Sequence, residues 1–308
     1  FQLIGHGARI LCAVIIGAPS SALASYTDTK HPIVLVHGVS GFDTVGGLVN
    51  YFHSIPWELE RSGATVHTVS VSFVNDSWTR GEQVRDYLYT LPGQKFNLIG
   101  HSQGSPTSRV AAHLAPHKVA SVTSVNGVNK GSKVADVLRG VIPPNSALEG
   151  GVSALAEAVG GLINTVTGSD NPQDGIAALE TLTTPGTTAL NRATQWRGVN
   201  QWGCTGTQET YHINGHPVRY FSWSGSGQWT SGIDATDPFL ATTGLVFGGT
   251  ENDGLVSTCS MKLGNVIGTH YTMNHIDAVN HLFGLRSIWT NPVSLYRSHA
   301  NRLKNRGL

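Results

Sequence analysis

Charged side chains are scarce in this 308-residue sequence. Asp, Glu, Lys and Arg make up 13% of it, and the formal net charge is +1. A nucleic-acid-binding chain usually carries a basic surplus or a basic stripe. The only basic concentration, residues 297–306, also carries His299 and Asn301 and is more typical of a solvent-exposed terminal helix. We therefore expect no nucleic-acid partner.

Long hydrophobic runs are also lacking. The apolar stretch at residues 10–18 is too short to span a bilayer. Pro19 breaks it, which argues against a hydrophobic core helix, and residues 22–24 have the small-x-small pattern of a signal-peptidase site. We predict that residues 1–24 are a cleaved signal peptide and that residues 25–308 form an exported protein without a transmembrane segment.

Cysteine is rare, with three residues in the chain. Cys12 lies in the predicted signal peptide, which leaves Cys204 and Cys259 as a pair in an oxidising compartment. There a disulfide is favoured over two free thiols. It would close a loop of more than fifty residues and contribute about 3–4 kcal/mol by the entropy of loop closure.

The pattern of apolar residues indicates an α/β fold. Residues 33–36 are apolar on both faces, as expected of a buried strand in a parallel sheet. Strands alternate with helices along the first half of the chain, which favours a mostly parallel central sheet with helices on both faces. The further strands expected there are residues 66–73, 96–99 and 119–125, and the helices are 51–62, 81–91 and 107–114.

The second half of the chain is less regular. We expect strands at residues 211–213 and 218–222 and a helix at residues 275–288. No linker or internal repeat divides the chain, so residues 25–308 are predicted to form a single domain.

Residues 140–170 form a distinct region. Residues 147–166 carry apolar side chains at helical spacing and only two charges, Glu149 and Glu157. A buried core helix has this pattern. So does a helical lid that covers an apolar cleft and lifts at a lipid surface. The periodicity alone does not choose between the two interpretations.

A G-x-S-x-G motif spans residues 100–104, with strand-like residues before it and a helix-compatible segment after it. This is the context of a nucleophile elbow, in which Ser102 occupies a sharp turn between strand and helix. Gly100 and Gly104 lack the Cβ atoms that would clash there. The backbone N–H of Gln103 would face a developing oxyanion. An ordinary Gly/Ser loop explains the pentapeptide but not the flanking elements.

An activated serine needs a base and an orienting acid, which follow it in the order acid, then histidine, in α/β-hydrolases. Spacing alone leaves several choices open, and a turn-forming role also explains Asp253. The second oxyanion donor is expected after the first strand, at the N–H of Val39. The candidate acids are Asp234, Asp237 and Asp253, and the candidate bases are His270, His275 and His281.

Seven stretches in order along the chain carry a family resemblance. They are residues 32–38 (PIVLVHG), 80–83 (RGEQ), 97–104 (NLIGHSQG), 220–225 (YFSWSG), 252–256 (NDGLV), 273–277 (MNHID) and 299–304 (HANRLK). In these stretches the chain resembles the secreted true lipases of Pseudomonas and Burkholderia, the triacylglycerol lipases of subfamilies I.1 and I.2. The resemblance covers nearly all of the predicted mature chain.

This resemblance implies an α/β-hydrolase fold and a secreted triacylglycerol lipase that works through an acyl-enzyme intermediate. It implies Ser102 as nucleophile, His275 as general base and acid, and Asp253 as orienting acid, with oxyanion donors at Val39 and Gln103. A carboxylesterase or polyester hydrolase with the same triad is the alternative. A catalytically silent binding protein and a peptidase are further rivals that no motif favours.

The resemblance also implies a structural Ca²⁺, a Cys204–Cys259 disulfide and two kinds of partner. The Ca²⁺ ligands would be the side chains of Asp234 and Asp277 and the main-chain carbonyls of His281 and Leu285, because Ca²⁺ prefers oxygen ligands. The expected partners are an ester substrate at a lipid interface and a membrane-anchored lipase-specific foldase, met on a route through the periplasm.

The sequence departs from the family pattern at three places. Ser105 follows the G-x-S-x-G motif where many relatives have another Gly. Residues 126–131 (NGVNKG) replace a segment that usually carries Pro-His before the basic residue. His281 stands in place of a usual Gln, a change that a main-chain ligand tolerates. None of these changes affects the implied triad.

Overall fold

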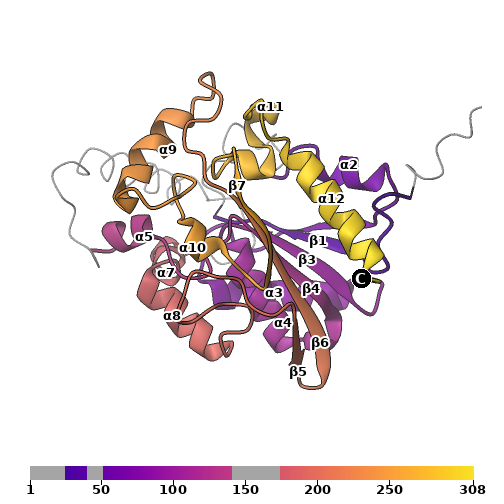
Figure 1. The fold of residues 1–308 in the computed structure, drawn as a ribbon. Coiled ribbons are helices and arrows are strands. Elements are labelled where there is room, and N and C mark those ends of the chain that lie inside the picture. Colours follow the sequence, from indigo (N-terminus) through magenta and orange to yellow (C-terminus); the bar gives the residue numbers. More distant parts are fainter. Residues whose placement is uncertain (1–24, 40–50, 141–173) are drawn as a thin grey trace, which may run out of the picture.

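The structure, a computed structural model, describes residues 25–39, 51–140 and 174–308 (Figure 1). The predicted signal peptide and residues 147–166, with their two alternative interpretations, lie outside the described residues. The predicted domain boundaries therefore stay a prediction.

A mostly parallel sheet forms the centre of the molecule, which confirms the predicted fold class. Its strand order is β2-β1-β3-β4-β6-β5. Strand β7 also pairs with β6, at residues 221–225, after the part of β6 that pairs with β5. All pairs are parallel except β5 with β6. The strands are β1 (Ile33–Val36), β2 (Val66–Val69), β3 (Phe96–His101), β4 (Val119–Val125), β5 (Thr210–Ile213), β6 (His216–Gly225) and β7 (Asn265–Tyr271).

Helices cover both faces of this sheet. The helices are α2 (Ile55–Glu60), α3 (Ser77–Thr90), α4 (Gly104–Leu114), α5 (Lys133–Leu138), α7 (Gly175–Thr181), α8 (Thr184–Ala193), α9 (Asp237–Gly244), α10 (Thr258–Met261), α11 (His281–Gly284) and α12 (Pro292–Asn305), with 3₁₀ turns η1 (Pro116–Lys118), η2 (Leu245–Phe247) and η3 (Asp277–Val279). Figure 1 shows α2 and α12 on one side of the strands and α3 and α4 on the other.

The side chains of β1 show why its sequence is continuously apolar. Val34 and Val36 belong to the core cluster beneath α3 and α4. Ile33 and Leu35 point to the opposite face and pack in the cluster that includes residues of α2 and α12. Because successive strand residues alternate between faces, a strand covered on both sides needs apolar residues throughout.

The predicted helix at residues 275–288 is wrong. The short elements η3 and α11 occupy this segment. Asn280 between them adopts a left-handed backbone with φ 56°, which ends the first turn. The side chain of Asn274 accepts hydrogen bonds from the backbone N–H groups of Ile276 and Asp277. Local capping by asparagine thus competes successfully with a continuous helix.

The observed ends of other helices and strands differ from the predicted ends by a few residues. Helix α3 begins four residues before the predicted start, because the carboxylate of Asp76 caps the N–H groups of Trp78 and Thr79. Helix α2 begins at Ile55 rather than at Tyr51. Strand β2 ends before the predicted residue 73, and β7 and the short helices α5 and α7–α10 were not predicted.

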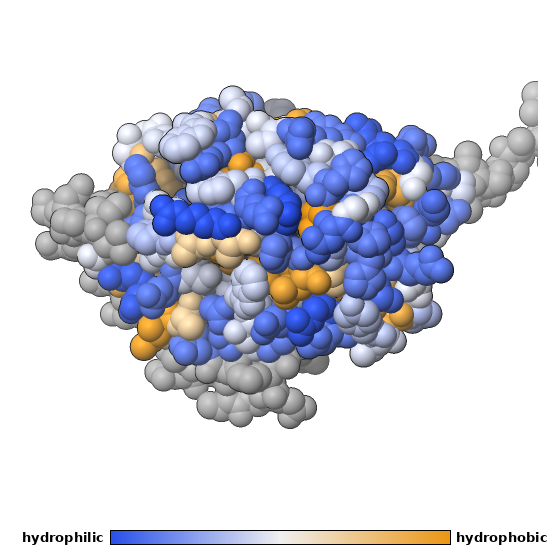
Figure 2. Space-filling model, turned by 90° about the horizontal axis from the view of Figure 1, so that it is seen from below, coloured by the Kyte–Doolittle hydropathy of each residue, from blue (hydrophilic) through white to orange (hydrophobic). Residues whose placement is uncertain are grey.

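Within the described ranges, each helix is too short or too polar to cross a bilayer. Figure 2 shows one face of the molecule as mostly hydrophilic, with apolar side chains in small separate patches.

Candidate active site

Ser102 occupies a strained turn directly after β3. Its backbone φ is 55°, in the left-handed region that non-glycine residues rarely adopt. Its N–H donates to the carbonyl of Val125 at the end of β4, at 3.1 Å. Cβ atoms added to Gly100 and Gly104 would lie 2.2 Å from the carbonyl oxygen of Gly104 and 2.1 Å from that of Val36. The structure therefore has the nucleophile elbow that the motif predicts.

His275 and Asp253 meet Ser102 at the carboxyl edge of the sheet. The hydroxyl of Ser102 lies 2.9 Å from Nε2 of His275, and Nδ1 of His275 donates to Oδ2 of Asp253 at 2.7 Å. The backbone N–H of His275 also donates to the carbonyl of Asp253 at 3.0 Å. Ser102 is 9% exposed, His275 4% and Asp253 0%, so the three groups form one buried hydrogen-bonded row.

The other candidate acids and bases do not belong to this row of hydrogen bonds. The Asp237 carboxylate accepts three backbone N–H bonds from residues 230–232. The His270 side chain is exposed and lies 3.4 Å from Glu251. His281 packs edge-on against Tyr51. Of the acids and bases that spacing left open, His275 and Asp253 are the two that hydrogen bonds join to Ser102 in one row.

The two predicted oxyanion donors flank Ser102. Gln103 follows it and stands at the N-cap of α4. Val39 follows Gly38, where an added Cβ would lie 2.7 Å from Cβ of Ser102. Among the described residues, neither the Val39 N–H nor the Gln103 N–H has a hydrogen-bond acceptor. In the described ranges, no acceptor thus competes with an anionic oxygen for these two N–H groups.

Buried Arg80 connects these two segments, and sequence analysis gave it no role beyond the family resemblance. Its guanidinium donates to the carbonyls of His37 and Gly38, at 2.5 and 3.1 Å, and to the side chain of Gln103. Burial lowers the pKa of Arg80 to about 9. Burial, followed by the charge of Arg80, lowers the pKa of His37 to about 3. Arg80 is therefore a cation whose hydrogen bonds fix the loop that carries Val39.

A second histidine supports the backbone of His275. Nε2 of His101 donates to the carbonyl of His275 at 2.9 Å, since a carbonyl only accepts. Nδ1 of His101 is then an acceptor, and the hydroxyl of Tyr51 donates to it at 2.6 Å. Burial holds the pKa of His101 well below its usual value. His101 is neutral in this arrangement and helps to position His275.

Two of the predicted Ca²⁺ ligands have carboxylate oxygens that lack a donor. Oδ2 of Asp234 and Oδ1 of Asp277 are buried and without a hydrogen-bond partner among the described residues. Burial is the main cause that raises the pKa of Asp277 to about 6, and the charges of Asp234 and Asp237 add to it. Such an environment suits a cation. The loop of Asp234 packs on Asp277 through Thr230, whose hydroxyl donates to Asp277 at 2.7 Å.

The other two predicted ligands follow Asp277 in the chain. His281 begins α11 and Leu285 comes directly after it. In the part of the chain that the structure describes, no three side chains of His, Cys, Asp or Glu come together as a metal site. The predicted site therefore depends on its two main-chain carbonyls as well as on its two carboxylates.

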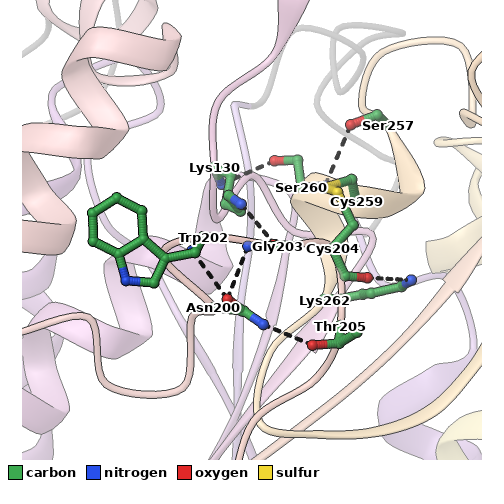
Figure 3. The surroundings of a disulfide bond; sticks show 10 residues. All are labelled: Lys130, Asn200, Trp202, Gly203, Cys204, Thr205, Ser257, Cys259, Ser260 and Lys262. Atoms are coloured by element: carbon green, nitrogen blue, oxygen red, sulfur yellow. Dashed lines mark hydrogen bonds between the residues drawn. A yellow bond between two sulfur atoms is a disulfide. The ribbon is translucent and has the colours of Figure 1, made fainter.

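The structure contains the Cys204–Cys259 disulfide. Figure 3 shows that lysines from two segments bind beside it: Lys130 donates to the carbonyl of Gly203 at 2.8 Å and Lys262 to that of Cys204 at 2.6 Å. The bridge joins the loop of Cys204 to α10, which closely follows Asp253 in the chain. It thereby restrains the segment that follows Asp253.

Removal of this disulfide should destabilise the fold. The Cys204→Ala/Cys259→Ala variant is expected to lose about 3–4 kcal/mol of unfolding free energy, because its unfolded chain regains the entropy of an open loop. Urea unfolding monitored by circular dichroism measures this difference. Reduced wild-type protein should match the variant, and equal midpoints for the oxidised protein and the variant would contradict the prediction.

Comparisons with known proteins agree with this geometry. Residues 31–149 match the α/β-hydrolase fold family. A metagenomic carboxyl esterase has a similar structure, with a TM-score of 0.61, 19% identity and coverage of 90% of this chain and 76% of that one. EstA from Clostridium botulinum also superposes at 0.61, with 19% identity and coverage of 90% and 88%. The fold is that of an α/β-hydrolase.

Relatives identified by sequence define the family more narrowly than the fold does. The chain is 47% identical to a triacylglycerol lipase of Vibrio cholerae over 95% of this chain and 94% of the relative. It is 38% identical to a triacylglycerol lipase of Pseudomonas fragi, over 91% and 98%, and 36% identical to one of Burkholderia plantarii, over 94% and 91%. The chain belongs to the triacylglycerol lipase family, which confirms the resemblance found in its motifs.

Proposed function

We propose that this lipase-family chain hydrolyses the ester bonds of triacylglycerols with Ser102, His275 and Asp253 as its catalytic triad. The observation that supports the proposal most strongly is the continuous row of hydrogen bonds from Ser102 through His275 to Asp253, at 2.9 and 2.7 Å. Three residues separated by 22 and 173 positions in the chain meet with the geometry that acyl transfer needs.

The reaction follows from the donors and acceptors of this row. Oγ of Ser102 attacks the ester carbonyl carbon, its proton passes to Nε2 of His275, and the carbonyl electron pair moves onto oxygen. The N–H groups of Val39 and Gln103 stabilise that oxyanion. Asp253 holds His275 in the Nδ1–H tautomer and stabilises the imidazolium. His275 then protonates the leaving alcohol, and water releases the fatty acid by the same steps in reverse order.

Substrate assays separate the proposed activity from its nearest alternative. Rates are measured on emulsified long-chain triacylglycerol and on a dissolved short-chain ester, and an organophosphonate inhibitor is mapped by mass spectrometry. Hydrolysis of the emulsion with labelling at Ser102 supports the proposal. Hydrolysis of the dissolved ester alone indicates a carboxylesterase, and labelling at another residue overturns the triad.

We further propose a structural Ca²⁺ held by Asp234 and Asp277 with the carbonyls of His281 and Leu285. The support is the pair of buried carboxylate oxygens that have no donor within residues 25–39, 51–140 and 174–308, and the proximity of this segment to His275. When bound, the ion would join the loop of Asp234 to the segment that follows His275. It would stabilise the position of His275 without taking part in proton transfer.

Removal of Ca²⁺ should lower thermal stability. Protein refolded in the presence of EDTA is expected to melt about 5 °C below protein refolded with excess Ca²⁺, because a ligand bound only to the folded state stabilises it. Refolding excludes tight retention of the ion. Asp234→Asn should abolish the difference, while Asp86→Asn at an exposed ion pair should preserve it. Equal melting with and without Ca²⁺ would count against the site.

The last part of the proposed function concerns how the protein is exported and folded. We propose that residues 1–24 direct export, that the lipase is secreted through the periplasm, and that a membrane-anchored foldase assists its folding. The support is the signal-peptide pattern and membership of the lipase family. Denatured protein should regain far more activity with a purified foldase than with serum albumin at the same concentration, and equal recovery would argue against this partner.

A further inference from the structure

The structure assigns to Asn126 the role of a positioning residue that holds Asp253 through its side-chain amide, an inference that rests on the proposed triad. Asn126 directly follows β4, whose last residue accepts the N–H of Ser102. Its Nδ2 donates to Oδ2 of Asp253 at 2.7 Å. This is the same oxygen that accepts the proton of His275 Nδ1.

The orientation of the Asn126 amide is fixed from both ends. The backbone N–H of Gly225 donates to its Oδ1 at 3.1 Å, and the carboxylate of Asp253 only accepts. An inverted amide would place a donor against a donor and an acceptor against an acceptor. The side chain is fully buried, so water does not compete for either bond.

The backbone of Asn126 is suited to this task. Its φ is 45°, in the left-handed region that asparagine tolerates better than most residues. Its own N–H donates to the carbonyl of Trp223 at 3.2 Å. The end of β4 and the end of β6 are thereby joined beneath the carboxylate, and the amide of Asn126 approaches Asp253 from a rigid part of the sheet.

Asn126 completes the set of hydrogen bonds around Asp253. Oδ1 of Asp253 accepts the N–H groups of Leu255 and Val256, at 3.0 and 2.8 Å. Oδ2 accepts from Asn126 and His275. Each oxygen thus has two donors, so that all the hydrogen bonds of this buried carboxylate come from fixed protein groups. Without Asn126, the negative charge would concentrate on the oxygen that faces His275, and Asp253 would lose one of the contacts that set its orientation.

Two substitutions separate this role from a merely structural one. Asn126→Gly tolerates the left-handed backbone and removes the amide; we expect kcat on a dissolved ester to fall about 10- to 100-fold with KM unchanged, as expected for loss of a hydrogen bond to a charged group.

Asn126→Asp keeps the acceptor for Gly225 but replaces the donor by a second carboxylate. Two carboxylates in contact share one proton. Its activity should therefore be low at alkaline pH and recover partly on acidification, the opposite of a simple acid limb. Among the described residues, the other titratable groups named at this ring are His101, whose ring centroid lies 4.7 Å from that of His275 with the ring planes tilted by 49°, and Tyr51 and His281, which interact with His101. They are unchanged in every variant.

Two controls test whether the Asn126 substitutions lower kcat through Asp253. Asn129→Asp alters a buried amide of the same segment that bonds Ser105 and Ser124 but not the triad, and a folded variant should keep the wild-type pH–rate profile. In an Asp253→Asn background, Asn126→Gly should change kcat less than two-fold, since its effect passes through Asp253. Circular dichroism and melting curves verify folding of each variant.

Three results would overturn the assignment: a wild-type kcat and pH profile in both Asn126 variants, a full effect of Asn126→Gly in the Asp253→Asn background, or failure of Asn126→Gly to fold. A Ser102→Ala variant distinguishes this outcome from failure of the triad. If Ser102→Ala retains activity, the proposed function fails; if it is inactive while Asn126 variants behave as wild type, only the role of Asn126 fails.

Discussion

Replacement of Ser102 by alanine is expected to lower kcat about 10⁶-fold, because it removes the atom that forms the acyl-enzyme. His275 and Asp253 would remain in contact but would have no nucleophile to activate. The residual rate should reflect only the binding of the substrate and the N–H groups of Val39 and Gln103. Kinetics on a soluble p-nitrophenyl ester, with titration of active sites by a phosphonate, measure both the rate and the loss of labelling.

Ser105→Ala is the matched control for this prediction. Ser105 is also a buried serine, three residues along the chain, and its hydroxyl donates to Oδ1 of Asn129 at 2.8 Å rather than to His275. We expect a kcat close to that of the wild type and full phosphonate labelling. A Ser102→Ala protein that kept a substantial fraction of wild-type activity would exclude the triad mechanism.

The Ser102 turn was predictable because its determinants are local. Gly100 and Gly104 make the close approaches that the G-x-S-x-G pattern requires, and the strand and helix on either side have clear apolar periodicity. The central strands were predictable for the same reason. In β1, four apolar residues in succession indicate burial on both faces, and the structure places alternate residues in two different core clusters.

The partners of Ser102 were not fixed by local pattern. The contact between His275 and Asp253 depends on how the loops after β6 and β7 pack, and spacing left three acids and three bases open. The family resemblance, rather than periodicity, selected the pair. Asn126 escaped notice because its role comes from a backbone φ of 45° and from contacts with Gly225 and Asp253, far away in the sequence.

The failed helix at residues 275–288 illustrates a related limit. Apolar spacing suggested one continuous helix, but the side chains of Asn274 and Asp277 bond to nearby backbone and to Thr230. These polar contacts hold His275 at the start of an irregular segment. Residues that serve a site often break the regular pattern by which sequence predicts structure.

Asp253→Asn is expected to lower kcat about 10⁴-fold while the fold persists, an effect that follows from counting donors. The carboxylate of Asp253 accepts four hydrogen bonds: two backbone N–H groups on Oδ1, and His275 and Asn126 on Oδ2. An asparagine at this position has one acceptor oxygen. Whichever way it turns, its NH₂ group faces two of the four donors.

The backbone donors are fixed, so the NH₂ group is expected to face His275. Nδ1 of His275 must then accept, which places the ring proton on Nε2, against the hydroxyl of Ser102. The ring is no longer a base toward Ser102, and the imidazolium also loses its counter-charge. kcat measured across pH on a soluble ester tests this. Asp136→Asn is the control, since Asp136 is a buried aspartate that binds Thr184 away from the triad.

Combining Asp253→Asn with Ser102→Ala tests whether the three residues act as one unit. In the single Asp253→Asn variant, Ser102 still provides a hydroxyl, so a small rate above that of Ser102→Ala should remain. The double variant should be no slower than Ser102→Ala alone, because an orienting acid has nothing to orient once the nucleophile is gone. Additive losses would mean that Asp253 acts on the ester independently of Ser102, which its complete burial beneath His275 argues against.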